Sequence, residues 1–190
     1  MPAHPQAGTR TDPFSQTRTL ETASDQLLLR PIRPGDDPEL LAFFRDRLSP
    51  RSQYLFCPHD PSQPDRCLEQ LRERVRRHAA RHDLAFVVEQ GKEIVGYFYL
   101  AGLDRSDGHA PTLGIGLADA LHGQGLGGAM MDHLLDGARA LGLPAVELTH
   151  ESTNERAGRL YQSRGFVYTG EEERSGPDGG RVERVMRWSG

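Results

Sequence analysis

The stretch from residue 113 to residue 141 constrains the fold more than any other part of the chain. A short apolar run at 113–118 predicts a buried strand, four glycines follow within six residues, and apolar side chains then recur at helix spacing up to Leu141. Glycines let a backbone approach a ligand without a Cβ in the way, and the first turn of a helix leaves N–H groups unpaired at its positive end. A strand, a glycine-rich turn and a helix in this order therefore predict a cradle for phosphate groups.

Two known kinds of phosphate cradle fit this turn poorly. A P-loop closes with Gly-Lys-Ser/Thr, and no lysine lies in the turn. The dinucleotide fingerprint G-x-G-x-x-G is formally present at Gly123, Gly125 and Gly128, and Glu147 follows about 20 residues on, where a ribose-binding acid would lie. That fingerprint normally opens a domain of several parallel strands, and only about a third of the chain remains after Gly128. A nucleotide-dependent oxidoreductase fragment therefore ranks last of the three functional hypotheses, and the other two follow below.

A different kind of cradle fits better. Six residues of the turn resemble the coenzyme A signature of GNAT N-acetyltransferases, Gln/Arg-x-x-Gly-x-Gly/Ala; they are His122, Gly123, Gln124, Gly125, Leu126 and Gly127. The histidine stands where the family has Gln or Arg. A later set matches the second half of the family, in which an Asn opens a helix, a Leu-Tyr pair ends it and Gly-Phe starts the next strand; the set is Asn154, Ala157, Leu160, Tyr161, Gly165 and Phe166. The resemblance covers roughly residues 27–188, and two motifs in order are more specific than either alone.

The resemblance implies the GNAT fold, a mixed α/β sheet with helices on both faces and the element order β-α-α-β-β-β-α-β-α-β-β. In that fold the glycine-bearing strand and its parallel neighbour splay apart, and acetyl-CoA lies in the gap and pairs with backbone groups as an added strand would. By resemblance, the backbone of Ile115 and Leu117 pairs with the pantetheine arm, and the N–H groups of residues 122–127 hold the pyrophosphate. Asn154 is expected to contact the coenzyme, although a plain helix N-cap would look the same in sequence.

The reaction that the resemblance implies is N-acetyl transfer, in which a primary amine attacks the thioester of acetyl-CoA directly in a ternary complex. Tyr161 matches the tyrosine that protonates the leaving sulfur in the family. The backbone N–H of Leu117 is expected to stabilise the oxyanion. The acceptor is either a small-molecule amine or a protein amine, because loops build the acceptor pocket and the sequence does not choose between them.

The sequence leaves the general base open. Related enzymes often carry a glutamate on the central strand or its neighbour, and here Thr112 and Thr149 hold those places. We name Glu147 as the catalytic candidate, while His150, Glu151 and a chain of water molecules stay open. The missing strand carboxylate motivates an alternative function, a non-catalytic acyl-CoA-binding regulatory module.

Two further segments are expected to border the ligands. Residues 48–56 look like the loop and short helix that help to wall the acceptor pocket in GNAT proteins related to bacterial protein-lysine acetyltransferases. The other interpretation of this segment is a helix cap over a buried Tyr and Phe. Gly114 and Gly116 alternate on one face of their strand, which leaves room either for a ligand or for close packing of a helix on the sheet.

Composition sets the remaining expectations. The net charge is −4 with mixed signs, which argues against non-specific nucleic-acid binding. No run of 18 apolar residues and no apolar leader segment are present, so neither a membrane span nor a signal peptide is predicted. Two cysteines, Cys57 and Cys67, are expected to be free thiols in the cytoplasm, and the histidines lack metal-ligand spacing, so no metal is expected. A homodimer stays open.

The chain is expected to hold one domain. Residues 1–25 are rich in Pro, Gly, Ser, Thr and Gln and are predicted to be a disordered tail, and residues 26–190 are predicted to form a single GNAT domain. Hydrophobic periodicity places strands at 27–32, 84–89, 94–100, 113–118, 145–149, 165–168 and 182–188, and helices from about residue 36 and at 65–81, 126–141 and 154–162.

Overall fold

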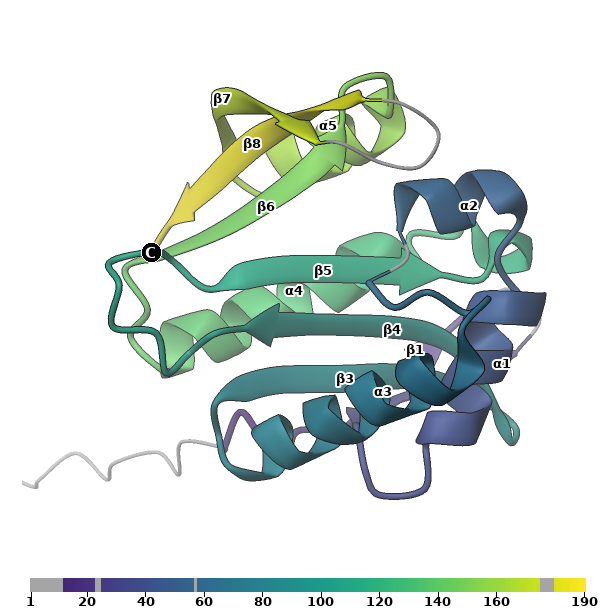
Figure 1. Cartoon of the computed structure of the whole chain (residues 1–190). Helices are drawn as coiled ribbons and strands as arrows, with labels where there is room; N and C mark the ends of the chain where they lie inside the picture. The colour runs from purple at the N-terminus through teal and green to yellow at the C-terminus, as the bar shows by residue number, and fades with distance from the viewer. Residues whose placement is uncertain (1–11, 23–24, 57, 175–179) are drawn as a thin grey trace, which may run out of the picture.

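The computed structural model describes residues 12–190 apart from 23–24, 57 and 175–179 (Figure 1). Its eight-stranded sheet has the order β1-β2-β3-β4-β5-β6-β8-β7. The strands are β1 (Arg18–Glu21), β2 (Gln26–Pro31), β3 (Asp83–Gln90), β4 (Glu93–Ala101), β5 (Thr112–Leu117), β6 (Ala145–Glu151), β7 (Val167–Arg174) and β8 (Arg181–Ser189). The helices are α1 (Asp37–Asp46), α2 (Pro50–Leu55), α3 (Pro64–Ala79), α4 (Leu126–Ala140) and α5 (Glu155–Gln162), and a 3₁₀ turn, η1 (Asp119–Leu121), follows β5.

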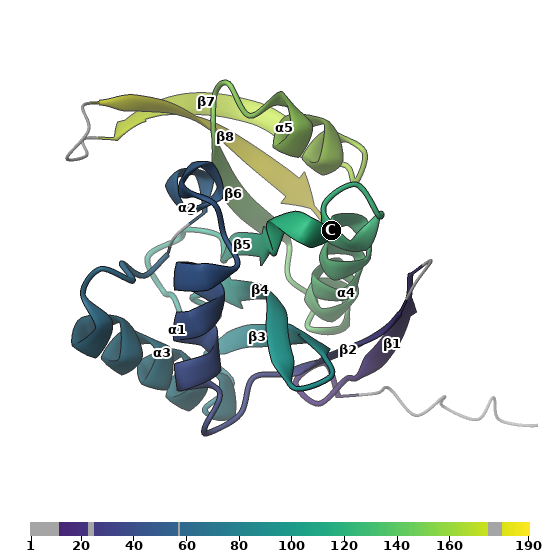
Figure 2. The same ribbon diagram turned by 90° about the vertical axis from the view of Figure 1, so that its right-hand side faces the viewer.

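Helices cover both faces of the sheet, which confirms the predicted mixed α/β class. α1, α2 and α3 lie on one face, and α4 and α5 lie on the other (Figure 2). Helix α4 buries the stripe that its periodicity predicts, with Met130, Leu134 and Ala138 completely buried. Burying one such Met or Leu side chain contributes roughly 1.5–3 kcal/mol, so this stripe holds α4 firmly on the sheet.

The sheet is antiparallel except where β5 meets β6. These two strands run parallel, as predicted from the helix that connects them, but they share a single pair, Thr112 with Glu147. β6 continues instead as an antiparallel partner of β8 over its whole length. Beyond the shared pair, therefore, β5 and β6 separate and leave a gap in the middle of the sheet.

The N-terminal segment corrects the expectation of a disordered tail. Arg18–Glu21 form β1, which pairs antiparallel with β2, and Phe14 is buried at 8% exposure against the ring of His78. The segment is polar on average, so its composition predicted disorder. Its few apolar residues are buried by packing against the rest of the folded domain, which composition does not reveal. Residues 1–11 and 23–24 lie outside the described part of the chain. With β1 and the short α2 added, the other elements follow the predicted order.

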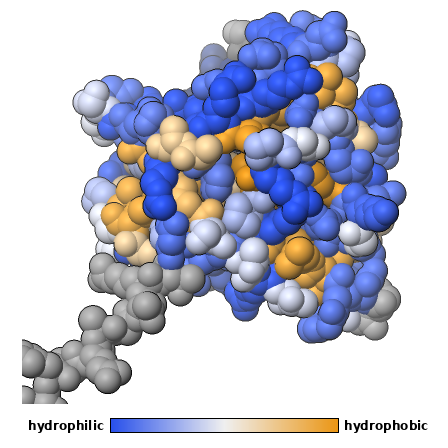
Figure 3. Space-filling view, turned by 90° about the horizontal axis from the view of Figure 1, so that it is seen from below, coloured by the Kyte–Doolittle hydropathy of each residue, from blue (hydrophilic) through white to orange (hydrophobic). Residues whose placement is uncertain are grey.

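The surface is mixed in character. On the face seen in Figure 3, hydrophilic residues cover most of the area and hydrophobic residues gather in separate patches. Among the described residues, no helix is both long enough and apolar enough to cross a membrane.

Candidate functional site

Backbone groups of β5 face the gap. The N–H of Ala118 donates to the carbonyl of Val95 on β4 at 2.8 Å, which sets the phase of the antiparallel ladder between β4 and β5. Residues that bond to the partner strand alternate in such a ladder. The N–H and C=O groups of Ile115 and Leu117 therefore point away from β4, toward the side from which β6 has separated. These are the groups that the family resemblance implies should pair with an extended ligand.

The turn after β5 presents a run of unbonded backbone N–H groups. Gly123 and Gly125 adopt φ values of +84° and +78°, which glycine reaches without strain, and Gly125 is the N-cap of α4 without any side-chain cap. Among the described residues, the N–H groups of residues 123–127 donate no hydrogen bond. A Cβ on Gly123 or Gly125 would meet no atom within 4 Å, so an anion can approach these groups freely.

His122 plays a different part from the one expected. Its N–H, predicted to belong to the cradle, donates instead to the carbonyl of Asp119 at 3.1 Å, because η1 closes a 3₁₀ turn there. Its ring Nε2–H donates to the carbonyl of Leu117 at 2.9 Å and lies 3.8 Å from the Asp119 carboxylate. The side chain thus points back to the end of β5 and occupies one of the carbonyls that border the gap.

The room expected beside the strand glycines is filled by aromatic rings. A Cβ on Gly114 would overlap the ring of Tyr99, and a Cβ on Gly116 would overlap the ring of Phe56. The glycines therefore permit close packing of rings from β4 and from the end of α2, which matches neither the ligand space nor the helix-on-sheet packing considered for them. Phe56 comes from the end of α2, so the segment 48–56 does lie against β5, on the α3 side of the sheet.

Tyr161 lies on the opposite face of the sheet. It lies on α5, packs against His150 and Phe166, and is buried at 8% exposure. Burial raises the pKa of its phenol to about 12, with the nearby Tyr99 as a second cause. The hydroxyl is therefore protonated at neutral pH, and among the described residues it has no hydrogen-bond partner. This arrangement suits a proton donor.

Two other predicted residues have structural partners. The side-chain oxygen of Asn154 accepts the N–H of Ala157 at 3.2 Å, so this residue is the N-cap of α5, and its amide nitrogen stays available. Glu147 lies at the closed end of the gap and forms an ion pair with Arg187 at 2.6 Å. His150, a further candidate, is buried, and its Nδ1–H donates to the carbonyl of Glu151 at 2.9 Å.

Sequence reasoning missed two residues of the site. The guanidinium of Arg164 lies where a Cβ of Gly128 would be, beside the first turn of α4, and contacts Asp132 at 3.3 Å. Tyr99 lies on β4 directly opposite Gly114. The Gly165-Phe166 motif adjoins Arg164 and could have directed attention to it, whereas Tyr99 in an apolar strand carries no sequence signal.

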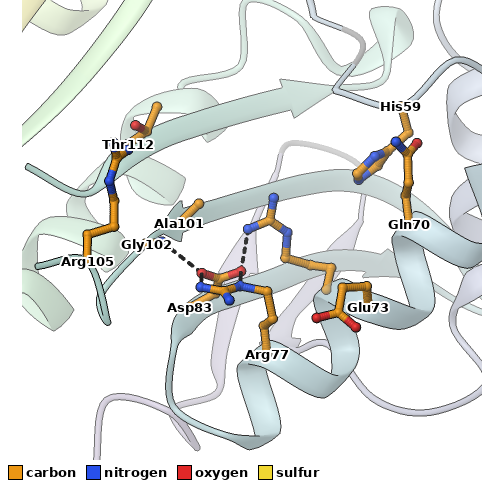
Figure 4. Close-up of a pocket in the computed structure, with 10 residues that line it drawn as sticks. His59, Gln70, Glu73, Arg77, Asp83, Ala101, Gly102, Arg105 and Thr112 are labelled. Carbon is orange, nitrogen blue, oxygen red and sulfur yellow. Dashed lines mark hydrogen bonds and ion pairs between the residues drawn. The ribbon is translucent and has the colours of Figure 1, made fainter. Parts of the chain in front are cut away.

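A pocket of about 440 Å³ opens between α3 and the ends of β3, β4 and β5 (Figure 4). Most of the residues that line it are of polar type; the lining residues are His59, Gln70, Glu73, Arg74, Arg77, Asp83, Ala101, Gly102, Arg105 and Thr112. Thr112 belongs to the pair that closes the gap, so the pocket adjoins the closed end of the gap on the α3 side of the sheet. Among the described residues, no group of three or more His, Cys, Asp or Glu side chains could hold a metal ion.

Helix α2 joins the two sides of the gap on the same face. At its start, the Asp119 carboxylate accepts the N–H of Ser49 at 2.9 Å and the hydroxyl of Ser52 at 2.5 Å. At its end, the carbonyl of Tyr54 accepts a hydrogen bond from Arg181 of β8 at 2.7 Å. The helix therefore lies between η1 and β8, and Figure 2 shows it beside the β6–β8 part of the sheet.

Comparison with known proteins gives one consistent result. Residues 26–167 match the profile of a family described as an acetyltransferase (GNAT) domain. A mycothiol acetyltransferase of Acidothermus cellulolyticus is 31% identical over 176 residues, which cover 84% of this chain and 51% of that protein. The chain thus spans about half the length of this curated relative.

Solved structures share the fold. A ribosomal-protein-S5-alanine acetyltransferase from Vibrio fischeri has a TM-score of 0.74 at 19% identity, over 90% of this chain and 96% of that one. A ribosomal L7/L12 alpha-N-protein acetyltransferase in complex with coenzyme A has a TM-score of 0.73 at 12% identity, over 90% and 98%.

Proposed function

Because the chain belongs to the GNAT acetyltransferase family, we propose that it is an N-acetyltransferase that moves the acetyl group of acetyl-CoA to a primary amine. The observation that carries this proposal is the run of backbone N–H groups at residues 123–127, which have no acceptor among the described residues and end at the positive terminus of α4. A pyrophosphate needs such a site, and the gap that starts beside it has the form that an extended pantetheine arm requires.

The coenzyme would lie between the two halves of the sheet. Its pantetheine amides pair with the backbone of Ile115 and Leu117, which face the gap, and its pyrophosphate accepts hydrogen bonds from residues 123–127. Arg164, beside the first turn of α4, adds a positive charge near the phosphates. The amide nitrogen of Asn154 is free to donate to the coenzyme as well, because only the side-chain oxygen serves as the helix cap.

The chemistry needs few groups. The lone pair of the amine attacks the thioester carbon, a C–N bond forms, and a gap-facing backbone N–H of β5 toward the closed end of the gap stabilises the negative charge on the carbonyl oxygen. Leu117, which the resemblance suggested for this role, lies at the cradle end of β5, away from Glu147. The C–S bond then breaks, and the thiolate takes a proton from the hydroxyl of Tyr161, while the proton that the newly bonded nitrogen releases as the amide forms restores the phenol. We keep Glu147 as the proposed base for the ammonium proton, because it lies at the closed end of the gap opposite Thr112. Its pairing with Arg187 must loosen when it acts.

The test measures coenzyme binding and transfer separately. Calorimetry with acetyl-CoA, CoA, NAD and NADP is expected to show binding of the first two alone. Release of CoA thiol is then followed across a panel of small amines and N-terminal peptides. If the protein binds NAD but not CoA, the proposal is wrong. If it binds acetyl-CoA but no amine in the panel causes release of CoA thiol, the non-catalytic acyl-CoA-binding module is favoured instead.

A further inference from the structure

The pocket in Figure 4 holds an arginine whose charge is only partly balanced. Asp83, which is fully buried, accepts hydrogen bonds from Arg74, from Nε and Nη2 of Arg77, and from the N–H of Gly102. Each of its oxygens therefore accepts two bonds, which fills the carboxylate. Arg77 has Asp104 as a second acidic partner at 2.6 Å. Arg74 has no second carboxylate within ion-pair distance among the described residues.

Arg74 is held rigidly although it lines an open pocket. Its side chain is 14% exposed, and its guanidinium lies over the ring of Tyr99, with 4.3 Å from Cζ to the ring centroid. This cation–π contact and the ion pair with Asp83 hold the guanidinium, whose planar N–H fork suits a carboxylate. The neighbouring His59 stays uncharged at neutral pH, because burial and then the charge of Arg74 lower its pKa to about 4.

The other acidic groups around the pocket are already engaged. Glu73 accepts a hydrogen bond from the exposed Arg76 at 2.8 Å. Arg105 is paired with Asp107 at 2.7 Å. Among the described arginines that line the pocket, Arg74 is thus the one whose single carboxylate partner, Asp83, is shared with another arginine.

Tyr99 links this arginine to the place of reaction. One face of its ring contacts Arg74, and its hydroxyl lies against Gly114, between the two gap-facing residues Leu113 and Ile115. A ligand that lies along Tyr99 with an anionic end at Arg74 would therefore bring its other end to β5. The proposed function places the thioester beside β5 in this part of the gap, toward its closed end.

We propose that the acceptor is an amine that also carries a carboxylate, and that Arg74 binds this carboxylate. The inference rests on the proposed function, since it assigns the acceptor of that same reaction. Arg74 acts as a specificity-determining residue: it holds the acid group of the acceptor while the amine lies at the gap.

Matched pairs of acceptors test this assignment. Release of CoA thiol is measured with glycine and ethylamine, β-alanine and propylamine, and phenylalanine and phenethylamine. We expect kcat/KM to favour the acid in at least one pair by about 10-fold or more, the effect of a charge-assisted hydrogen bond. The preference should fall toward 1 in Arg74→Gln and be intermediate in Arg74→Lys, which keeps the charge but loses the planar fork.

Arg76→Gln is the matched control, because Arg76 lies on the same helix and bonds only to Glu69 and Glu73 among the described residues. It should keep the preference for the acid. Where a pair gives no product, calorimetry of the amino acid with the CoA-bound protein is the readout, and binding that disappears in Arg74→Gln supports the assignment.

Equal rates within every pair, a preference that survives in Arg74→Gln, or no binding of any acid would overturn the carboxylate subsite. Acetylation of plain amines in that case would leave the proposed function standing. If the parent protein does not bind acetyl-CoA, both the proposed function and the carboxylate subsite are wrong.

Discussion

Tyr161 of α5 is the proposed proton donor, and burial raises the pKa of its phenol to about 12. We expect Tyr161→Phe to lower kcat about 100-fold or more, since general acid catalysis commonly contributes this much. The affinity for acetyl-CoA, measured by calorimetry, should stay near that of the parent. Tyr168→Phe, which removes a hydroxyl from an exposed position on β7, is the control. Equal turnover in Tyr161→Phe and the parent would show that Tyr161 is not the proton donor and has only a structural role.

His133 makes the fold sensitive to acid. Its ring packs edge-on against Phe86 at 4.5 Å in the core, and burial, followed by the charge of Arg18, lowers its pKa to about 4. The unfolded chain binds this proton near pH 6.5, so the stabilisation is complete above that pH and is lost as the pH falls toward 4. The contribution is on the order of 3 kcal/mol.

His133→Phe should therefore flatten the decline of the unfolding free energy between pH 7 and pH 4.5 in urea titrations. Stability at pH 7 should change little, because the ring Nε2 has no partner among the described residues. Replacing the exposed His109 by Gln is the control. A decline as steep in His133→Phe as in the parent would show that other groups cause the acid sensitivity.

At the scale of elements, the two ends of α4 offer a matched pair of glycines. Gly125 begins the helix at φ +78°, and Gly142 follows its end at φ +67°; a Cβ on either would meet nothing within 4 Å. Valine at either position is strained by roughly 1–3 kcal/mol, so Gly125→Val and Gly142→Val should lose similar stability in urea. Gly125→Val alone should abolish detectable binding of acetyl-CoA in calorimetry, because its side chain fills the cradle. Equal affinities in the two variants would disprove the cradle.

The elements themselves were largely predictable, and the side-chain arrangement around the gap was not. Helix α4 and the glycine turn follow from periodicity and from backbone requirements that are local in sequence. The rings of Tyr99 and Phe56, in contrast, reach the strand glycines from β4 and α2, so their places depend on tertiary packing. The ring of His122 had several acceptors within reach, and only the folded turn selects the carbonyl of Leu117.

At the scale of the whole molecule, the N-terminal segment is part of the core. The Nε2–H of His78 donates to the carbonyl of Phe14 at 3.1 Å, and Phe14 and Leu20 are both buried. Phe14→Ala should cost roughly 3 kcal/mol of unfolding free energy, as expected for a large buried side chain. Leu141→Ala, at a position that is 37% exposed, is the control. A loss below about 1 kcal/mol for Phe14→Ala would mean that the segment is not held in solution.

Main-chain continuity across the sheet depends on one pair of residues. The strands β1 to β5 lie on one side of Thr112 and Glu147, and β6, β8 and β7 lie on the other. The bound pantetheine proposed above would form backbone hydrogen bonds with β5 in the gap, where no bonds to β6 exist beyond the closing pair among the described residues. The coenzyme would then act as an added strand as well as a substrate, and the hydrogen bonds that it makes to β5 would be lost each time CoA dissociates. Backbone amides near the gap would therefore exchange their hydrogens fastest in the interval between turnovers, and the protein would be stiffest while its substrate is bound.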